Sequence, residues 1–149
     1  MTDKEDKRKL DDLSLQVLDT MNEILVLQCD LEHRMRAGWL SLSRTRLLLG
    51  HSFASVAQFD NRVTQPNVTM HVHDNGHDLE FSVHQLTSHA SQAKRRFGAL
   101  SPAAAKDCEQ RFSEATELVA QLATTRAKLT EQIGMYEKMR GKSGAEKEE

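Results

Sequence analysis

The sequence predicts a mainly α-helical protein, in which a long antiparallel helical hairpin (a coiled coil) carries a small β-hairpin inserted between its two helices. Charged residues make up 28% of the 149 residues, aromatic residues make up only 5%, and there are 2 Pro and 7 Gly. Apolar residues recur with helical spacing toward both ends, and they alternate with polar residues in the middle. This combination favours long helices with a narrow apolar face over a compact core.

The first helix is expected over residues 9–50, after a charged leader at residues 1–8. Steps of about 3.6 residues from Leu10 meet apolar side chains everywhere except at Gln28 and Arg46. The positions are Leu10, Leu13, Val17, Met21, Ile24, Gln28, Leu31, Met35, Trp39, Leu42, Arg46 and Leu49. Further leucines widen this stripe beyond what one facing helix would cover, so a second partner surface is expected. They are Leu15, Leu18, Leu25, Leu27, Leu40 and Leu47.

Two glycines mark the end of this helix. A Gly inside a helix costs about 1 kcal/mol relative to Ala, so Gly38 indicates the close approach of another element near Trp39. Gly50 follows the last periodic leucine, where a left-handed C-terminal cap is expected.

The second helix is expected over residues 101–140, with Ser101 as the capping residue and Pro102 at the first helical position. Its seam has the alternating three- and four-residue spacing of a coiled coil. The seam residues are Ala115, Leu118, Leu122, Thr125, Leu129, Gln132, Tyr136 and Met139, flanked by Phe112, Val119 and Ile133. The Gly-rich, charged tail at residues 141–149 is expected to be disordered.

Antiparallel pairing with Gly50 near Ser101 would make the numbers of facing residues sum to about 151, because both helices rise equally per residue. This register predicts three charge pairings and two separated thiols. It places Arg44 and Arg46 near Asp107 and Glu109, places Glu23 near Lys128, and keeps Cys29 too far from Cys108 for a disulfide.

A linker at residues 51–100 is expected to hold the β-hairpin at about residues 67–83. Val68, Met70 and Val72 alternate with polar residues, as do Leu79, Phe81 and Val83. Between them, Asn75-Gly76 is the preferred pair for a tight two-residue hairpin turn.

The histidines of this hairpin are the nearest approach to a catalytic or metal-binding signal. His71 and His73 share one strand face, and His77 could add a third zinc ligand across the turn. This spacing is not specific to metal sites, and a solvated polar face is the simpler interpretation. Phosphate-binding loops and nucleophile motifs are absent from the sequence, so we expect no cofactor and no enzymatic activity.

Charge and hydropathy exclude further classes of function. The formal net charge of -2 gives no general attraction to nucleic acid. Apolar runs of the roughly 20 residues that span a bilayer are absent, and the N-terminus does not read as a signal peptide. We therefore expect a cytoplasmic protein without a membrane span of its own.

Two motifs resemble the coiled-coil domain-containing protein 115 family. Gly38-Trp39-Leu40-Ser41-Leu42, followed by Arg44, Arg46 and Gly50, resembles the segment that ends the first helix in that family. Phe97-Gly98-Ala99-Leu100-Ser101-Pro102, before a helix with Phe112 and Leu118, is similar to the family's closing segment. The chain departs from the family in its short His-containing middle and at Leu47, where the family tends to an aromatic residue.

The resemblance implies an assembly chaperone for the membrane sector of the vacuolar proton-pumping ATPase. Such a protein would act on the cytosolic face of the endoplasmic reticulum, or at endosomes or lysosomes. It would pair through its helices with a membrane-anchored partner of the transmembrane protein 199 type and with membrane-sector subunits. The expected partner-binding residues are Gly38, Trp39, Leu40, Leu42, Arg46 and Leu47, and the expected seam includes Met35, Leu49, Phe112, Leu118, Leu122 and Leu129.

Other functions fit the same pattern. The order of long helix, β-hairpin and long helix also resembles a prefoldin subunit, whose hairpins join into a barrel and whose helix tips hold unfolded clients. A generic coiled-coil scaffold would carry identical sequence signals. A small metalloenzyme built on His71, His73 and His77 ranks below these alternatives.

Overall fold

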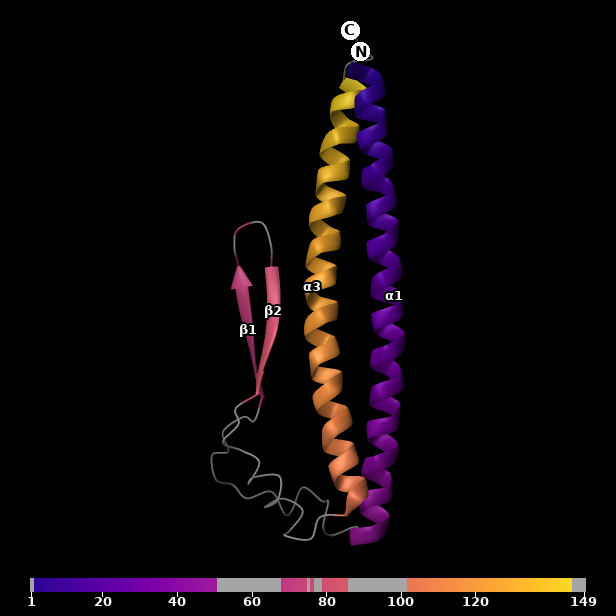
Figure 1. Ribbon diagram of the computed structural model, residues 1–149, viewed down its shortest axis with the longest axis vertical. Helices are drawn as coiled ribbons and strands as arrows, with labels where there is room; N and C mark the ends of the chain where they lie inside the picture. Colours follow the sequence, from indigo (N-terminus) through magenta and orange to yellow (C-terminus); the bar gives the residue numbers. More distant parts are fainter. Residues whose placement is uncertain (1, 51–67, 75, 77–78, 86–101, 146–149) are drawn as a thin grey trace.

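Two long helices packed side by side form the protein, with a two-stranded hairpin on the outer side of one of them (Figure 1). The computed structural model describes residues 2–50, 68–74, 76, 79–85 and 102–145. Helix α1 spans Thr2–Leu49 and helix α3 spans Ala103–Ala145, and the hairpin consists of β1 (Val68–Asp74) and β2 (Leu79–Gln85). The predicted fold class, a mainly helical hairpin with a small β-hairpin between the helices, is confirmed.

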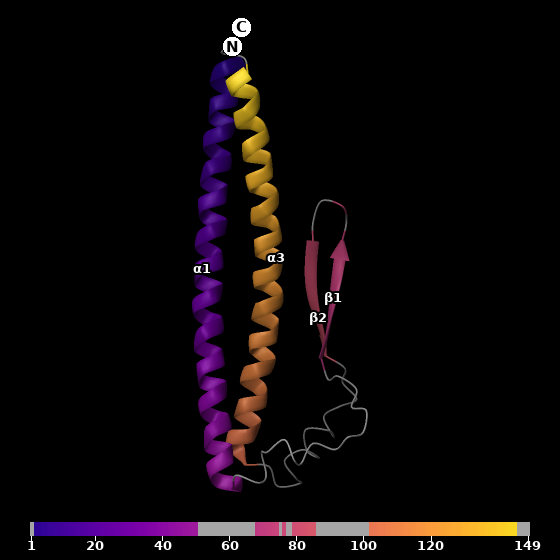
Figure 2. The ribbon, with the colours of Figure 1, turned by 180° about the vertical axis from the view of Figure 1, so that it is seen from behind.

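The helices run antiparallel, so that the start of α1 at Thr2 and the end of α3 at Ala145 lie at the same tip of the rod (Figures 1 and 2). At 1.5 Å per residue, the 48 residues of α1 extend about 70 Å. Helix α1 begins at Thr2 instead of near Lys9, so the predicted leader is part of the helix, and α3 continues to Ala145 through part of the predicted tail. Residues 146–149 lie outside the described residues, as does most of the predicted linker.

The seam of α1 repeats every 3.5 residues, and this corrects the predicted face. Its positions are Leu13, Val17, Thr20, Ile24, Leu27, Leu31, Arg34, Gly38, Ser41 and Thr45, each buried or half-buried. Steps of 3.6 residues drift about 20° per heptad from a supercoiled seam, so the prediction moves one residue too far along the helix. Met21, Trp39 and Arg46 were therefore wrongly placed in the seam and are exposed, while Thr20, Gly38 and Thr45 occupy it.

The seam of α3 follows the predicted three- and four-residue spacing. Leu122, Thr125 and Gln132 are buried at 7–8% exposure, and Leu118 and Leu129 between them are half-buried. Buried threonines in both helices satisfy their hydroxyls locally: Thr45 donates to the carbonyl of Ser41 at 2.8 Å and Thr125 to that of Gln121 at 3.0 Å. Gln132 differs, because its buried Oε1 has no hydrogen-bond partner.

Helix ends follow local backbone rules. Gly50 follows Leu49 with φ of 84°, as predicted for a left-handed cap. Pro102 precedes α3 and does not form its first residue: its carbonyl accepts from the N–H groups of Ala105 at 3.0 Å and Lys106 at 3.4 Å. The prediction of Ser101 as the capping residue lies outside the described residues.

The β-hairpin pairs Val68 with Gln85 at its open end and Asp74 with Leu79 near its turn. Four residues therefore separate the paired strands, instead of the predicted two-residue Asn-Gly turn. Gly76 has φ of 79°, and its N–H donates to Asp74 Oδ1 at 2.8 Å. An Asp side chain that accepts from the backbone two residues on is a turn device in its own right, which explains the longer loop.

The hairpin lies on the side of α3 that faces away from α1, with β2 nearer to α3 than β1 (Figures 1 and 2). The Phe81 N–H donates to Thr124 Oγ1 at 3.0 Å, so a helix side chain occupies the outer edge of β2. Ala120, one turn before Thr124, is only 3% exposed although it is off the seam, so the hairpin covers this face of α3.

Candidate protein-interaction surface

Phe112 of α3 packs its ring directly on the backbone of Gly38. A Cβ at Gly38 would lie 3.1 Å from Phe112 Cζ and 3.2 Å from Cε1, closer than the 3.5–4.0 Å of an ordinary carbon contact. The same ring meets the indole of Trp39 edge to face, with centroids 5.4 Å apart at 80°. The predicted close approach beside Trp39 is confirmed, and it explains why a glycine stands inside the helix.

Polar contacts hold the two helices in register around this ring. Arg34 forms an ion pair with Glu114 across the helices, and the hydroxyl of Ser41 donates to Asp107. Both pairs, like Trp39 with Phe112, lie within about one turn of the predicted antiparallel register. The sequence did not predict these two pairs, but the predicted nearness of Arg44 to Asp107 agrees with the effect of the Arg44 charge on that carboxylate.

The Asp107 carboxylate accepts hydrogen bonds from both helices, from Ser41 of α1 and from Arg111 of α3. The hydrogen bond from Ser41, and then that from Arg111, lower the pKa of Asp107 below its usual value, with smaller effects of nearby positive charge including Arg44. Arg111 Nε lies 3.2 Å from Asp107 Oδ1. The neighbouring Cys108 is buried, and desolvation followed by the adjacent carboxylates raises the pKa of its thiol. A buried thiol with a raised pKa stays protonated and is a poor nucleophile.

The expected partner-binding residues divide between the two sides of α1. Gly38 is buried and Leu42 is half-buried, so both contribute to the coiled coil. Trp39, Leu40 and Leu47 are exposed to 55%, 63% and 85%, and Arg46 is exposed beside them. We call Trp39, Leu40 and Leu47 the basal patch, because they lie at the end of the rod opposite the chain termini.

The expected seam residues are placed as follows. Leu122 is buried, and Met35, Leu49, Phe112, Leu118 and Leu129 are half-buried. Leu48 is 68% exposed beside the basal patch in sequence, and sequence reasoning did not single it out. The signal that could have found it is the Gly50 cap, since the last turn of a helix has fewer neighbours to cover it.

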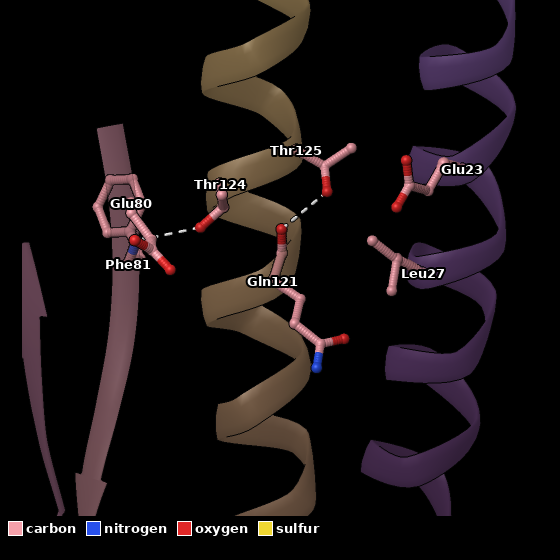
Figure 3. A pocket seen from close by; sticks show the side chains of 7 residues that line it. All are labelled: Glu23, Leu27, Glu80, Phe81, Gln121, Thr124 and Thr125. Atoms are coloured by element: carbon pink, nitrogen blue, oxygen red, sulfur yellow. Dashed lines mark hydrogen bonds between the residues drawn. The ribbon is translucent and has the colours of Figure 1, made fainter. Parts of the chain in front are cut away.

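A groove of about 300 Å³ lies where β2, α3 and α1 come together (Figure 3). Glu80 and Phe81 line it from β2, Glu23 and Leu27 line it from α1, and three polar residues of α3 form its floor: Gln121, Thr124 and Thr125. Thr124 accepts from Phe81 and donates to the Ala120 carbonyl at 3.1 Å, and Thr125 donates to Gln121. Both hydroxyls are therefore engaged in holding the hairpin and the helix.

The histidines of the hairpin lie on its polar face. The rings of His71 and His84 meet edge to face with centroids 4.6 Å apart, and His71 Nε2 is 3.5 Å from Thr69 Oγ1. Within the described residues, groups of three or more His, Cys, Asp or Glu suited to a metal ion are absent. His77, the predicted third ligand, lies outside those residues.

The described helices contain no segment long and apolar enough to cross a membrane. No protein-family model matches the chain, and no characterised protein matches it by sequence. The fold and its surface define the class of protein: an antiparallel coiled-coil hairpin that displays large apolar side chains outside its own seam.

Proposed function

We propose that this protein is an assembly chaperone for the membrane sector of the vacuolar proton-pumping ATPase. It would act by helix-mediated binding to a membrane-anchored partner of the transmembrane protein 199 type at the cytosolic face of the endoplasmic reticulum. The pump and the location come from the resemblance of the segments around Trp39 and Pro102 to the coiled-coil domain-containing protein 115 family.

The observation that carries the proposal is the basal patch. Leu40 and Leu47 contribute nothing to the α1–α3 seam, yet they remain 63% and 85% exposed beside a half-exposed Trp39. Tryptophan flanked by leucines is the composition of an interface hot spot, in which a few apolar anchors contribute most of the binding energy. A rigid helix that presents such anchors suits a helix-on-helix contact.

The test uses charge at the patch. Trp39→Asp and the pair Leu40→Asp with Leu47→Asp place carboxylates where the partner's apolar surface would lie, so capture of the partner and acidification of the organelle should both be lost. The leucine pair separates binding from folding, because Trp39 also touches Phe112. Met135→Asp, at a 43% exposed site on α3, is the matched control and should leave capture intact.

Circular dichroism should show the same helicity in all three variants. Normal acidification in cells that carry only the Trp39→Asp chain, or only the leucine pair, would contradict the proposal.

A prefoldin-like co-chaperone subunit is the second candidate, and one feature of the hairpin favours it. Met70, Val72 and Leu79 share one face of the hairpin and are 42–54% exposed, as expected of strands that join a larger barrel. Native mass spectrometry of the purified complex separates the two functions. A multi-subunit barrel bound through the hairpin supports the prefoldin-like function, and a single membrane-anchored partner bound through the helices supports pump assembly.

A further inference from the structure

A second apolar row runs along the half of α1 nearer its N-terminus, on the side away from α3. Leu15, Leu18 and Leu25 are exposed to 61–62%, with Met21 and Val26 beside them at 47% and 54%. The row continues through exposed Asn22 and Cys29 and so advances by three and four residues alternately. This is the same 3.5-residue repeat as the α3-facing seam, so the row stays straight along the supercoiled helix.

This row is separate from the basal patch. Between the two lie charged residues, and Arg36 Nη2 forms an ion pair with Glu32 Oε2 at 3.1 Å across the exposed face. The Leu15–Cys29 row covers about 20 Å of helix at 1.5 Å per residue, which is the length of four turns of a partner helix.

One sign of charge flanks the row. The stretch from Leu10 to Leu31 contains five carboxylates and no Lys or Arg. Four of them, all exposed, follow one side of the row at helical spacing: Asp12, Asp19, Glu23 and Asp30. In coiled coils, charges beside the apolar seam select the partner by attraction and repulsion.

We propose that this acidic leucine row is the docking site for a basic amphipathic helix of another protein. The partner helix would place apolar residues at alternating three- and four-residue spacing on Leu15, Leu18 and Leu25. It would place Lys or Arg opposite Asp19 and its neighbours. A second copy of this chain would bring carboxylates against carboxylates, and an anionic lipid surface would be repelled in the same way.

The experiment uses two synthetic four-heptad peptides with Leu at the seam positions, one with Lys and one with Glu at the flanking positions. Each is titrated into the full chain by fluorescence anisotropy. The Lys peptide should bind saturably and more weakly as salt rises, and the Glu peptide should bind at least ten-fold more weakly, an order-of-magnitude figure for opposite flanking charge. The chain's helicity is checked by circular dichroism in every variant.

Two variants locate the site. Leu18→Gln with Leu25→Gln should weaken binding of the Lys peptide at least ten-fold, since two buried leucines would be lost from the interface. Asp19→Lys with Asp30→Lys should reverse the preference toward the Glu peptide. Val119→Gln with Met135→Gln, at 42% and 43% exposed sites on α3, is the matched control and should bind as the unchanged chain does.

Four results would overturn the proposal: equal binding of both peptides, equal loss in the α3 control, no binding of the Lys peptide, or a self-association that Leu18→Gln with Leu25→Gln abolishes. The peptides contain no part of the ATPase, and the substitutions that locate the site leave the basal patch unchanged. Failure here therefore leaves the proposed function standing, and failure of the acidification test leaves this site standing.

Discussion

Replacing Gly38 with Leu tests whether the Phe112 ring sets the spacing of the two helices. A Leu side chain at residue 38 begins with a Cβ 3.1 Å from the ring and then needs three more carbons in the space the ring fills. Overpacking of this kind costs about 1–3 kcal/mol, against a gain of about 0.8 kcal/mol from the better helix propensity of Leu. The net expectation is a loss of about 1 kcal/mol in the free energy of unfolding, within a range of about 0.2–2.2 kcal/mol.

The same substitution is then made in a chain that carries Phe112→Ala, which removes the ring. Phe112 is half-buried, so its truncation should cost roughly half of the 3–5 kcal/mol of a fully buried Phe, together with about 0.5–1.5 kcal/mol for the aromatic pair with Trp39. Gly38→Leu should then be neutral or stabilising, because the Leu side chain fills the vacated space. The two changes should therefore be coupled by about 2 kcal/mol.

Urea denaturation, followed by circular dichroism, measures the free energy of unfolding of four chains. They are the unchanged chain, Gly38→Leu, Phe112→Ala and the double variant. Gly134→Leu is the matched control, since a Cβ at Gly134 meets nothing within 4 Å, and it should stabilise both backgrounds by about 0.8 kcal/mol. If Gly38→Leu shifts stability equally with and without the Phe112 ring, within about 0.5 kcal/mol, the ring does not define the helix spacing.

Two further predictions concern polar groups of the seam. Gln132→Leu removes a buried acceptor that lacks a partner and should raise the free energy of unfolding by about 1–2 kcal/mol in urea denaturation, whereas the exposed control Gln16→Leu should stay within about 0.5 kcal/mol of the unchanged chain. Asp107 has a lowered pKa in the folded chain, so its stabilising effect is complete above its ordinary pKa of 3.8 and is lost as the pH falls through the folded value. Ser41→Ala should raise the pKa of Asp107, measured by NMR titration, and reduce this acid-dependent loss of stability; an unchanged titration would show that the Ser41 hydrogen bond does not govern the carboxylate.

The antiparallel helix pair could be predicted because the apolar residues of α3 have unambiguous coiled-coil spacing. The three- and four-residue spacing of this helix is read directly from Leu118, Leu122, Leu129 and their neighbours, and no residue period has to be assumed. In α1, apolar residues lie on most sides of the helix. A period of 3.6 residues and a period of 3.5 residues therefore both select apolar positions, although the two sets of positions separate along the helix. The small residues Gly38 and Ser41 then mark the face that turns to α3, because the Phe112 ring packs on Gly38 and Asp107 accepts from Ser41.

The hairpin could be predicted from its alternating pattern, but its position on α3 could not. Nothing in the sequence marks Thr124 as the acceptor for the Phe81 N–H, since most helical threonines bond their own backbone, as Thr124 also does. The four-residue loop escaped prediction because the Asn75-Gly76 pair was taken as the whole turn, whereas the Asp74 side chain also accepts from the Gly76 N–H and forms a turn of its own. The Trp39 surface could be proposed from composition, although the seam residues Gly38 and Leu42 had to be separated from it by geometry.

The distribution of large apolar residues argues that α1 is built for more than its own folding. A coiled coil selected only for stability would place leucines in its seam, yet α1 buries Ser41 and Thr45 there and leaves Leu40 and Leu47 exposed on the opposite side. Burying a leucine stabilises the fold by about 1.5–3 kcal/mol. The coiled coil is therefore less stable than it would be with leucines at these seam positions. A partner that covers the basal patch or the acidic leucine row would raise the free energy of unfolding, because a ligand that binds only the folded state stabilises that state. The stability of α1 and the occupancy of its outer face should therefore rise together.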